Sequence, residues 1–498
     1  MRLLSFFLLI SCQALLAQVP YFNIQFDYNH KWEGVTDVIE ADSNYVIVGG
    51  TGAPFQNDTG LIITVRKSDL TFGTHKLDYF TGTKMRAIAP APDKSGIILH
   101  SRYFIGSQMP ANENMFLAKL NSSLDTVAFK TYGLPNIAEY TLDMNVGSDG
   151  SISLTGYTYQ GQTTPSEIIL FKCDSSLHQI FFKTYTKNLL RNHFGTGLTD
   201  TPDKGLIVVG NRYPDSEHSA GIIFKVDSLG NQVWWKDIFR QGVEKHLFLQ
   251  DIVRKEDGTY LVVGEKVFDP IVGTDYQQYW LLNLDENGEI LWSKEYGYND
   301  WTGWNRIARC SDGNYAMCGY EKDEYANGNT HKQYGVISKV TPSGNLLWHR
   351  KYTMSTENKR YDVFNGFTPT SDGGFICVGT VWGDNTSREN AWVVKLDSLG
   401  CLEPGCDPSV SVIELPVGEA SPITIYPNPT DGLFTVEARE GQRIGHVRVY
   451  DAQGRTVLEK QVEMSGQVPL DLSAAPPGGY FCAVLVGGVW VVRQVSIR

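Results

Sequence analysis

The sequence predicts an all-β protein, a seven-bladed β-propeller followed by a small, immunoglobulin-like β-sandwich. The first reason is a repeat: a turn, an apolar run and a closing glycine, as in residues 371–379, return with their closing glycines 54 to 60 residues apart. Fixed periods of this size are typical of propellers and solenoids. The second reason is composition, because 49 glycines and 12% aromatic residues accompany short apolar runs between turn residues. Such runs are typical of β-strands.

The repeat passes seven times along the chain. Five clear copies and two weaker upstream copies occupy residues 43–49, 93–100, 148–156, 202–210, 256–264, 311–319 and 371–379. Each pass contains four strand-like runs, which in the sixth pass are residues 306–309, 314–318, 334–340 and 345–350. Turn residues join the first run to the second and the third to the fourth, as tight antiparallel connections require. Four strands per repeat predict one propeller blade per repeat.

The two ends of the array complement each other. The last pass has no fourth strand after Gly400, whereas an unassigned strand at residues 21–28 resembles a fourth strand. We therefore expect the N-terminal strand to complete the seventh blade, which removes the exposed sheet edges of an open array. This gives a propeller spanning residues 18–406.

The flanking segments differ from the repeats. Residues 1–17 combine one positive charge, a short apolar stretch and small residues before a cleavage site after Ala17, which indicates a secretory signal peptide. A lipoprotein box ending at Cys12 is the alternative. Residues 407–421 read as a linker. Residues 422–498 contain short alternating strands divided by turn residues, which suit a small β-sandwich.

Charge and motifs restrict the classes of function. A net charge of -12 without a basic cluster argues against nucleic-acid binding. The ten histidines lack metal-ligand spacing and no common catalytic or nucleotide-binding motif occurs, so we expect no metal and no cofactor. Cys401 and Cys406 bound a tight loop whose ends can pair as a disulfide in an oxidising compartment. We expect a monomer.

Candidate ligand-binding residues gather on one face of the disc, where all the long connections lie. The residue six positions before each turn should line the central channel, and this column reads Asp37, Ala87, Asp143, Gly197, Asp251, Arg306 and Gly366. Three carboxylates and a guanidinium at the mouth suit a cation, a sugar or a catalytic reaction. The alternative is that each carboxylate accepts backbone N–H bonds from a neighbouring blade.

Tryptophans on the same face are a second set of candidates. Trp301 and Trp304 have polar neighbours and could stack on sugar rings or anchor a protein. The alternative is packing between blades, because tryptophan is usually well buried.

Three boxes near the C-terminus resemble a known family. They contain Pro427, Asn428, Pro429 and Gly432, then Tyr450, Asp451 and Gly454, and finally Gly479 and Tyr480. In this order they resemble the type A C-terminal sorting domain of the type IX secretion system of Bacteroidota. The resemblance implies export across the outer membrane after signal-peptide-directed passage through the periplasm. It also implies recognition by the secretion machinery and frequent removal of the domain, often in exchange for attachment to lipopolysaccharide.

Together these observations predict a secreted or cell-surface propeller that binds a glycan or protein through its long-loop face without catalysing a reaction. The alternative is an extracellular hydrolase acting on polysaccharide through two carboxylates among Asp37, Asp143 and Asp251. A glycosidase of that kind needs two acids about 5 to 10 Å apart across an open cleft.

Overall fold

The computed structural model divides the chain into two compact units, residues 1–406 and 407–498. It describes residues 21–26, 32–52, 59–77, 84–93, 95–105, 112–134, 137–160, 164–187, 191–213, 218–239, 244–268, 276–322, 332–354, 360–382, 389–402, 423–439, 443–451, 456–486 and 489–498. The predicted signal peptide and the whole predicted linker lie outside these residues. In the described part of the chain every regular element is a β-strand, which confirms the all-β prediction.

The strands of the first unit follow one another in antiparallel groups. They are β1 (Phe22–Phe26), β2 (Trp32–Glu40), β3 (Asn44–Gly52), β4 (Thr59–Arg66), β5 (Phe72–Leu77), β6 (Lys84–Pro90), β7 (Gly96–Ile105), β8 (Asn112–Asn121), β9 (Thr126–Tyr132), β10 (Ala138–Val146), β11 (Ile152–Tyr159), β12 (Ile168–Cys173), β13 (Gln179–Tyr185), β14 (His193–Asp200), β15 (Leu206–Arg212), β16 (Ala220–Val226), β17 (Gln232–Ile238), β18 (Glu244–Arg254), β19 (Tyr260–Phe268), β20 (Tyr276–Leu284), β21 (Ile290–Arg309), β22 (Tyr315–Lys322), β23 (Lys332–Val340), β24 (Leu346–Tyr352), β25 (Arg360–Tyr361), β26 (Val363–Pro369), β27 (Phe375–Trp382) and β28 (Glu389–Leu396).

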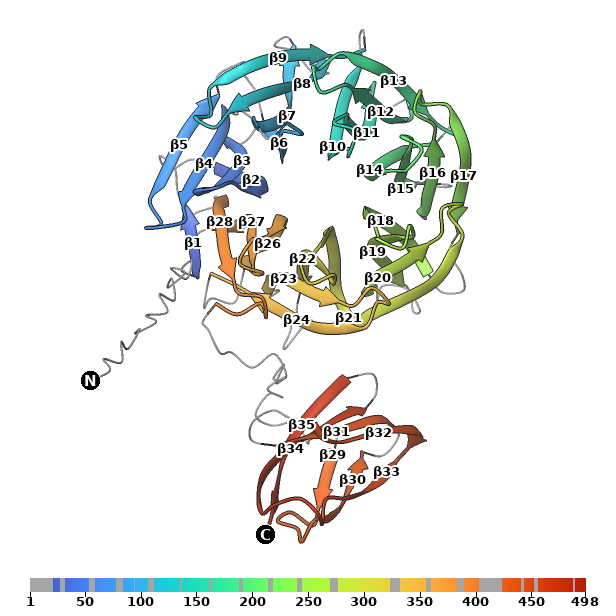
Figure 1. Cartoon of the computed structure of the whole chain (residues 1–498). Coiled ribbons are helices and arrows are strands. Elements are labelled where there is room, and N and C mark those ends of the chain that lie inside the picture. The colour runs from blue at the N-terminus through green and yellow to red at the C-terminus, as the bar shows by residue number, and fades with distance from the viewer. Residues whose placement is uncertain are drawn as a thin grey trace, which may run out of the picture. The chain divides into compact units, whose positions relative to one another are not determined.

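These strands form sheets arranged as a ring around one axis (Figure 1). The four-stranded sheets are β2-β3-β4-β5, β6-β7-β8-β9, β10-β11-β12-β13, β14-β15-β16-β17 and β1-β28-β27-β26. β18 to β25 form one eight-stranded sheet, in which β25 pairs with β23. The larger sheet consists of two parts joined by β21, whose residues 290–300 pair with β20 and whose residues 301–309 pair with β22. We count these two parts as neighbouring sheets of the ring. The strands nearest the axis are β2, β6, β10, β14, β18, the second half of β21, and β26, which we call the inner strands. This arrangement confirms the propeller prediction.

The N-terminal strand is paired with the last repeat of the ring. β1 runs antiparallel to β28 from Phe22 opposite Lys395 to Phe26 opposite Ala391. The indole Nε1 of Trp392 donates a 2.7 Å hydrogen bond to the side-chain oxygen of Asn23. The first strand of the propeller and the last part of its chain therefore share one sheet.

The apolar core lies between successive sheets. One cluster joins Phe22, Val38 and Ile47 to Ile376 and Val393, so residues from both ends of the propeller meet in it. Strands in the middle of each sheet are buried on both faces, which explains their near-continuous apolar sequences. The hydrophobic residues that gave the repeat its signal thus hold neighbouring sheets together.

Tight turns on the outer part of the ring also connect sheets. In residues 227–231 the Asp227 carboxylate accepts bonds from the backbone N–H groups of Leu229 and Asn231 at 2.9 and 2.8 Å. Gly230 follows with φ of 75°, a conformation that favours glycine. Its carbonyl accepts a 2.7 Å bond from the Tyr185 hydroxyl of the preceding sheet. The same contact recurs from Tyr132 to Leu177, from Tyr296 to Gly344 and from Tyr352 to Gly400.

The second unit contains two antiparallel sheets. One comprises β29 (Ile423–Tyr426), β30 (Leu433–Ala438) and β33 (Gln467–Asp471), and the other comprises β32 (Thr456–Ser465), β31 (Ile444–Tyr450), β34 (Gly478–Val486) and β35 (Val489–Ile497). Side chains of both sheets, including Phe434 and Val468 of the first and Val447 and Cys482 of the second, form one core. Two sheets around a shared core make a β-sandwich. The more specific immunoglobulin-like topology stays a prediction.

Candidate functional site

Each inner strand has a β-bulge at the same place, immediately before the residue predicted to line the channel. The register with the neighbouring strand shifts between Val35 and Asp37, and at the corresponding positions of the other six described inner strands. A bulge adds one unpaired residue and redirects the side chains beside it. The bulged residues are Thr36, Arg86, Leu142, Thr196, Gln250, Asn305 and Asn365.

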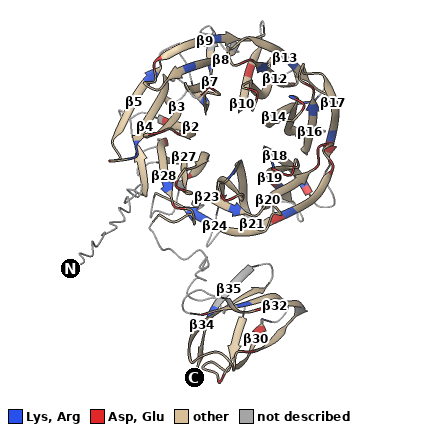
Figure 2. Ribbon diagram, viewed as in Figure 1, with Lys and Arg blue, Asp and Glu red and all other residues tan. Residues whose placement is uncertain are grey.

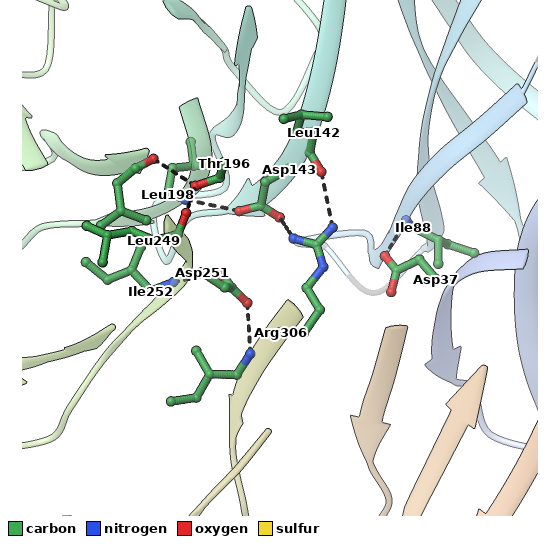
Figure 3. A network of polar contacts seen from close by, with 12 residues as sticks. Asp37, Ile88, Leu142, Asp143, Thr196, Leu198, Leu249, Asp251, Ile252 and Arg306 are labelled. Atoms are coloured by element: carbon green, nitrogen blue, oxygen red, sulfur yellow. Dashed lines mark hydrogen bonds and ion pairs between the residues drawn. The ribbon is translucent and has the colours of Figure 1, made fainter. Parts of the chain in front are cut away.

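The three channel aspartates bind the backbone of the next sheet (Figure 3). Each carboxylate accepts a bond from an inner-strand N–H: from Ile88 to Asp37 at 3.0 Å, from Leu198 to Asp143 at 3.0 Å, and from Ile307 to Asp251 at 2.9 Å. The second oxygen of Asp37 accepts the N–H of Val38, and that of Asp251 accepts the N–H of Ile252. These carboxylates therefore join neighbouring sheets. This agrees with the alternative stated above, in which each carboxylate accepts backbone N–H bonds from its neighbour in the ring.

Arg306 reaches across the axis rather than to its neighbour in the ring. Its Nη1 lies 2.8 Å from Asp143 Oδ1, and its Nη2 donates a 3.1 Å bond to the carbonyl of Leu142 (Figure 3). Burial raises the pKa of Asp37 to about 6 against the opposing charge of Arg306. Burial also raises the pKa of Asp143 despite its ion pair, and burial together with Asp143 raises that of Asp251. The structure thus brings these four residues together around the axis, and their role in ligand binding stays a prediction.

Most of the bulged residues make further contacts between sheets. The hydroxyls of Thr36 and Thr196 donate to the carbonyls of Met85 and Leu249 at 3.0 and 2.6 Å. The amides of Asn305 and Asn365 donate to the carbonyls of Phe364 and Val35 at 3.1 and 2.9 Å. At the junction before β10, His100 Nε2 instead contacts the hydroxyl of Thr141. A polar ring around the axis thus links the inner strands.

This polar ring weakens the hydrolase hypothesis. Both oxygens of each of Asp37, Asp143 and Asp251 already bond to the protein, so their first role is to hold sheets together. A catalytic acid or base must be able to reach a substrate atom. No contact in the described residues favours such a role for these carboxylates.

Trp304 is not a surface residue, which corrects its proposed role in ligand binding. It is fully buried, and its ring stacks on Tyr279 with centroids 4.6 Å apart. Its Nε1 donates a 3.0 Å bond to the Ser338 hydroxyl. Trp304 directly precedes the bulge of its strand and faces the packing between sheets, so a ligand cannot reach it.

Trp301, in contrast, belongs to an exposed group of aromatic side chains. We call Trp301, Tyr361 and Trp382 the aromatic platform; their side chains are 46%, 43% and 37% exposed. The ammonium of Lys322 lies 5.7 Å from the ring centroids of both Trp301 and Tyr361. Tyr361 and Trp382 are 5.8 Å apart at an angle of 59°. The platform spans two adjacent sheets of the ring.

A second polar column lies four residues before the channel column. The polar members of this column that the structure describes are buried. Most of them bond to the connection that precedes their own strand. Glu139 accepts a 2.5 Å bond from the N–H of Leu134, and Asp362 accepts a 2.7 Å bond from the hydroxyl of Thr353. His193 contacts the carbonyl of Arg191 at 2.8 Å. These groups fix the connections on the long-loop face.

Glu139 makes stability depend on pH. Burial raises its pKa from an ordinary value near 4.5 to about 8. Between these values the folded protein binds more protons than the unfolded chain, so stability should fall as pH rises from 5 to 9. Replacing Glu139 by Gln should flatten this fall by about 1 to 2 kcal/mol. Denaturation midpoints across this pH range measure the effect, and Glu286→Gln, at an exposed position, serves as the control. If the stabilities of Glu139→Gln and the native chain change in parallel with pH, Glu139 is not the group responsible.

A Ser338, His349 and Glu321 chain has the hydrogen-bond order of a hydrolytic triad. Ser338 Oγ lies 2.8 Å from His349 Nδ1, and His349 Nε2 lies 2.8 Å from Glu321 Oε2. Burial alone would raise the pKa of Glu321, but His349 and Lys351 outweigh it and lower the pKa to about 2. Ser338 is fully buried and already accepts the Trp304 bond. We therefore interpret this chain as a packing network.

A cavity of about 340 Å³ opens beside the axis, on the side where the inner strands begin. It is lined by Gly34, Val35, Thr36, Arg86, Leu142, Arg306, Asn365, Thr380 and Glu389. Its volume lies at the lower end of the range for small-ligand sites. Among the described residues no cluster of His, Cys, Asp and Glu could hold a metal ion, and no helix has the length and apolarity needed to cross a bilayer.

In the second unit the first of the three boxes binds the end of the chain. The side-chain oxygen of Asn428 accepts a 3.0 Å bond from the N–H of Ser496, and Thr430 exchanges backbone bonds with Ser496 and Arg498 at 2.9 and 3.0 Å. Gly432 has φ of 105°, and a Cβ there would lie 2.4 Å from Ser473 Cα. The box therefore requires glycine at this position.

The other sorting residues lie in or beside the larger sheet. Tyr450 ends β31, Asp451 follows it, and Gly479 and Tyr480 lie in β34, where the Tyr480 hydroxyl donates a 2.7 Å bond to the carbonyl of Pro476. Pro427 and Pro429 follow cis peptide bonds in the first box. Gly454 lies outside the described residues.

The predicted disulfide is described at one end only. Cys401 is buried and disulfide-bonded. Cys406 lies outside the described residues, so its pairing with Cys401 stays a prediction. Cys173, Cys310, Cys318, Cys377 and Cys482 are free and buried.

The described units thus define a chain of the propeller class that carries a separate β-sandwich module. Residues 424–498 match the family of secretion system C-terminal sorting domains. This match confirms the resemblance to the type IX sorting domain. It implies interaction with the type IX secretion machinery and indicates export to the cell surface or the medium.

Solved structures are similar to the propeller only at a low level. They include a protein of unknown function from Bacteroides caccae (13% identity, 60% of this chain and 90% of that chain covered, TM-score 0.35). Others are polysaccharide lyase Uly1 (9%, 78% and 94%, 0.48) and the β-propeller domain of the Trilobed protease from Pyrococcus furiosus (9%, 73% and 95%, 0.40). These values give no indication of a ligand or reaction. No curated protein matches the chain.

The sequence interpretation missed Arg86, Tyr361, Thr380 and Glu389. A signal for Arg86 was present, because the column one residue before the channel column is polar in six of its seven members. Tyr361, Thr380 and Glu389 lie outside any repeated column that we used. Only the folded ring places them beside the predicted residues.

Proposed function

We propose that the propeller binds a carbohydrate chain by stacking sugar rings on the aromatic platform. The observation that carries this proposal is the exposure of Trp301, Tyr361 and Trp382 in two adjacent sheets. Trp301 lies within β21, where the pairing passes from β20 to β22, and Tyr361 and Trp382 end β25 and β27. Aromatic faces provide large contact areas, while a polar neighbour can bond to groups on the same ligand. Here Lys322 lies beside two of the rings.

The position of the platform on a β-scaffold favours binding. Trp301 pairs with Lys322 across β21 and β22, and Trp382 pairs with Glu389 across β27 and β28. Strand pairing fixes the backbone that carries these side chains, so less conformational freedom is lost when a ligand binds. Grouped exposed aromatic residues on a soluble domain commonly mark an interaction site. The sorting domain supports a location where extracellular polysaccharide is available.

Alanine variants of Trp301, Tyr361 and Trp382 test the proposal. A panel of soluble polysaccharides first identifies one that the native protein binds. We expect each variant to weaken binding to that polysaccharide by about tenfold or more, as is typical of anchor residues. Calorimetric titration gives the affinities, and melting temperatures show that the variants fold. Phe129→Ala, which removes a ring that is 37% exposed on β9, should bind normally.

Trp304→Ala distinguishes a surface role from a packing role. This variant should lose about 3 to 5 kcal/mol of stability, because it leaves a large cavity in the core. Its folded fraction should bind with native affinity. Full polysaccharide affinity in folded Trp301→Ala and Trp382→Ala variants would reject the platform as the carbohydrate-binding site. If these variants instead lost binding to a protein while their polysaccharide affinity stayed native, the platform would be a protein-recognition site.

A further inference from the structure

We propose that the cavity beside the axis receives the carboxylate of an acidic sugar, so that the preferred ligand is a uronate-containing saccharide. This inference rests on the proposed carbohydrate binding and specifies its ligand. It starts from the two guanidinium groups, Arg86 and Arg306, that line the cavity from different sheets. Planar guanidinium groups match carboxylates because parallel N–H donors face the two oxygens.

Arg306 is held in place and still has donors available. Its bonds to Asp143 and Leu142 use one hydrogen on each of two nitrogens. A guanidinium has five N–H groups, so three are not used in these bonds. The same contacts fix the direction of the guanidinium, which reduces the entropy lost when a ligand carboxylate binds.

The remaining polar lining suits the hydroxyl groups of a sugar. Thr380 and Asn365 provide neutral hydrogen-bonding groups, and Glu389 provides an acceptor for hydroxyl donors. The carboxylates of Glu389 and Asp143 also repel a ligand with two negative charges more strongly than a ligand with one. A singly charged carboxylate with neighbouring hydroxyl groups therefore fits better than a phosphate.

The cavity and the aromatic platform share the same pair of strands. Thr380 and Trp382 are two residues apart on β27 and so face the same side of the sheet. Glu389, which lines the cavity, is the partner of Trp382 across the strand pair. A saccharide that stacks on the platform can therefore place one carboxylate in the cavity. This gives one binding site with an aromatic part and a cationic part.

The test compares trigalacturonate, and a hyaluronan tetrasaccharide, with the same molecules after reduction of their carboxylates to alcohols. The native protein should bind at least one acidic form about tenfold more tightly than its neutral counterpart, because bonds to a charged group are stronger. Arg86→Met should remove most of this preference while binding of the neutral form persists. Lys130→Met, an exposed change of the same charge on β9, should preserve the preference.

Arg306 needs a paired variant, because removing it alone leaves Asp143 buried without its partner. Asp143→Asn/Arg306→Met removes both charges and should reduce the preference while the protein stays folded. Equal affinity for acidic and reduced forms, no binding of either, or an unchanged preference in Arg86→Met would overturn the inference.

The two proposals can fail separately. If the native protein binds acidic and reduced forms equally and Trp301→Ala and Trp382→Ala lose all binding, the platform is supported and the carboxylate site is rejected. Native affinity in those platform variants, with a preference that depends on Arg86, would support the cavity and reject the platform. Melting temperatures of every variant accompany the affinities.

Discussion

Removal of residues 424–498 will leave the propeller folded but retained inside the outer membrane. The propeller residues and the sorting module form separate compact units, so neither needs the other for its core. The sorting module is the part that the secretion machinery recognises. In a host that has the type IX secretion system, the truncated chain should disappear almost completely from the surface and the medium. Cell fractionation measures this, and the melting temperature of the periplasmic form shows folding.

A single glycine permits a sharper version of this experiment. Gly432→Ala should cause the same export defect, because φ of 105° disfavours a side chain and a Cβ would lie 2.4 Å from Ser473 Cα. Gly466→Ala is the matched control, since a Cβ there meets no atom within 4 Å. Normal surface levels of the truncated chain would contradict the role of the module, and equal export of both glycine variants would contradict the importance of the box.

Deletion of residues 18–28 will open the ring between its first and last sheets. The deletion removes all pairs of β1 with β28 and the buried side chain of Phe22. It also leaves the indole N–H of Trp392 without its bond to Asn23. We expect a loss of about 4 kcal/mol or more from these contributions together. The exposed edge of β28 should also promote aggregation.

Hydrogen exchange locates this effect. Amides of β26 to β28 and β2 to β5 should exchange faster in the deletion variant, whereas β14 to β17 on another part of the ring should change least. A synthetic peptide of residues 18–28 should restore protection when added in excess. Uniform exchange around the ring, or no change near β28, would contradict closure by β1.

Local sequence was sufficient to predict strands wherever a turn residue marked their ends. In the sixth repeat the turn at residues 311–313 separates β21 from β22, as predicted, because Asp312 and Gly313 suit a tight turn. The continuous strand β21 was not predicted, since Gly297 and the polar residues after it read as a loop. Pairing with β20 up to Tyr296 and at Asp300, followed by pairing with β22 from Trp301, makes the strand continuous.

The candidate site was predicted less completely, because one bulge changes which way a side chain points. Counting six positions back from each turn placed Asp37, Asp143, Asp251 and Arg306 around the axis, and the structure brings them there. The sequence did not show that Trp304 faces the core while Trp301 stays exposed. Both lie on the same strand in similar polar surroundings, and contacts with Tyr279 and Ser338, distant in sequence, decide between them.

The recurrent bulge of the inner strands has a consequence for evolution by duplication. Each bulge presents a side chain at the same position of its inner strand. Threonine, asparagine and arginine can therefore occupy equivalent positions and make different contacts. A duplicated repeat would inherit a bulge whose contacts already fit the inner strands beside it. Its axial residue would then be free to diversify, so new ligand specificities could arise at the axis while the junctions stay intact.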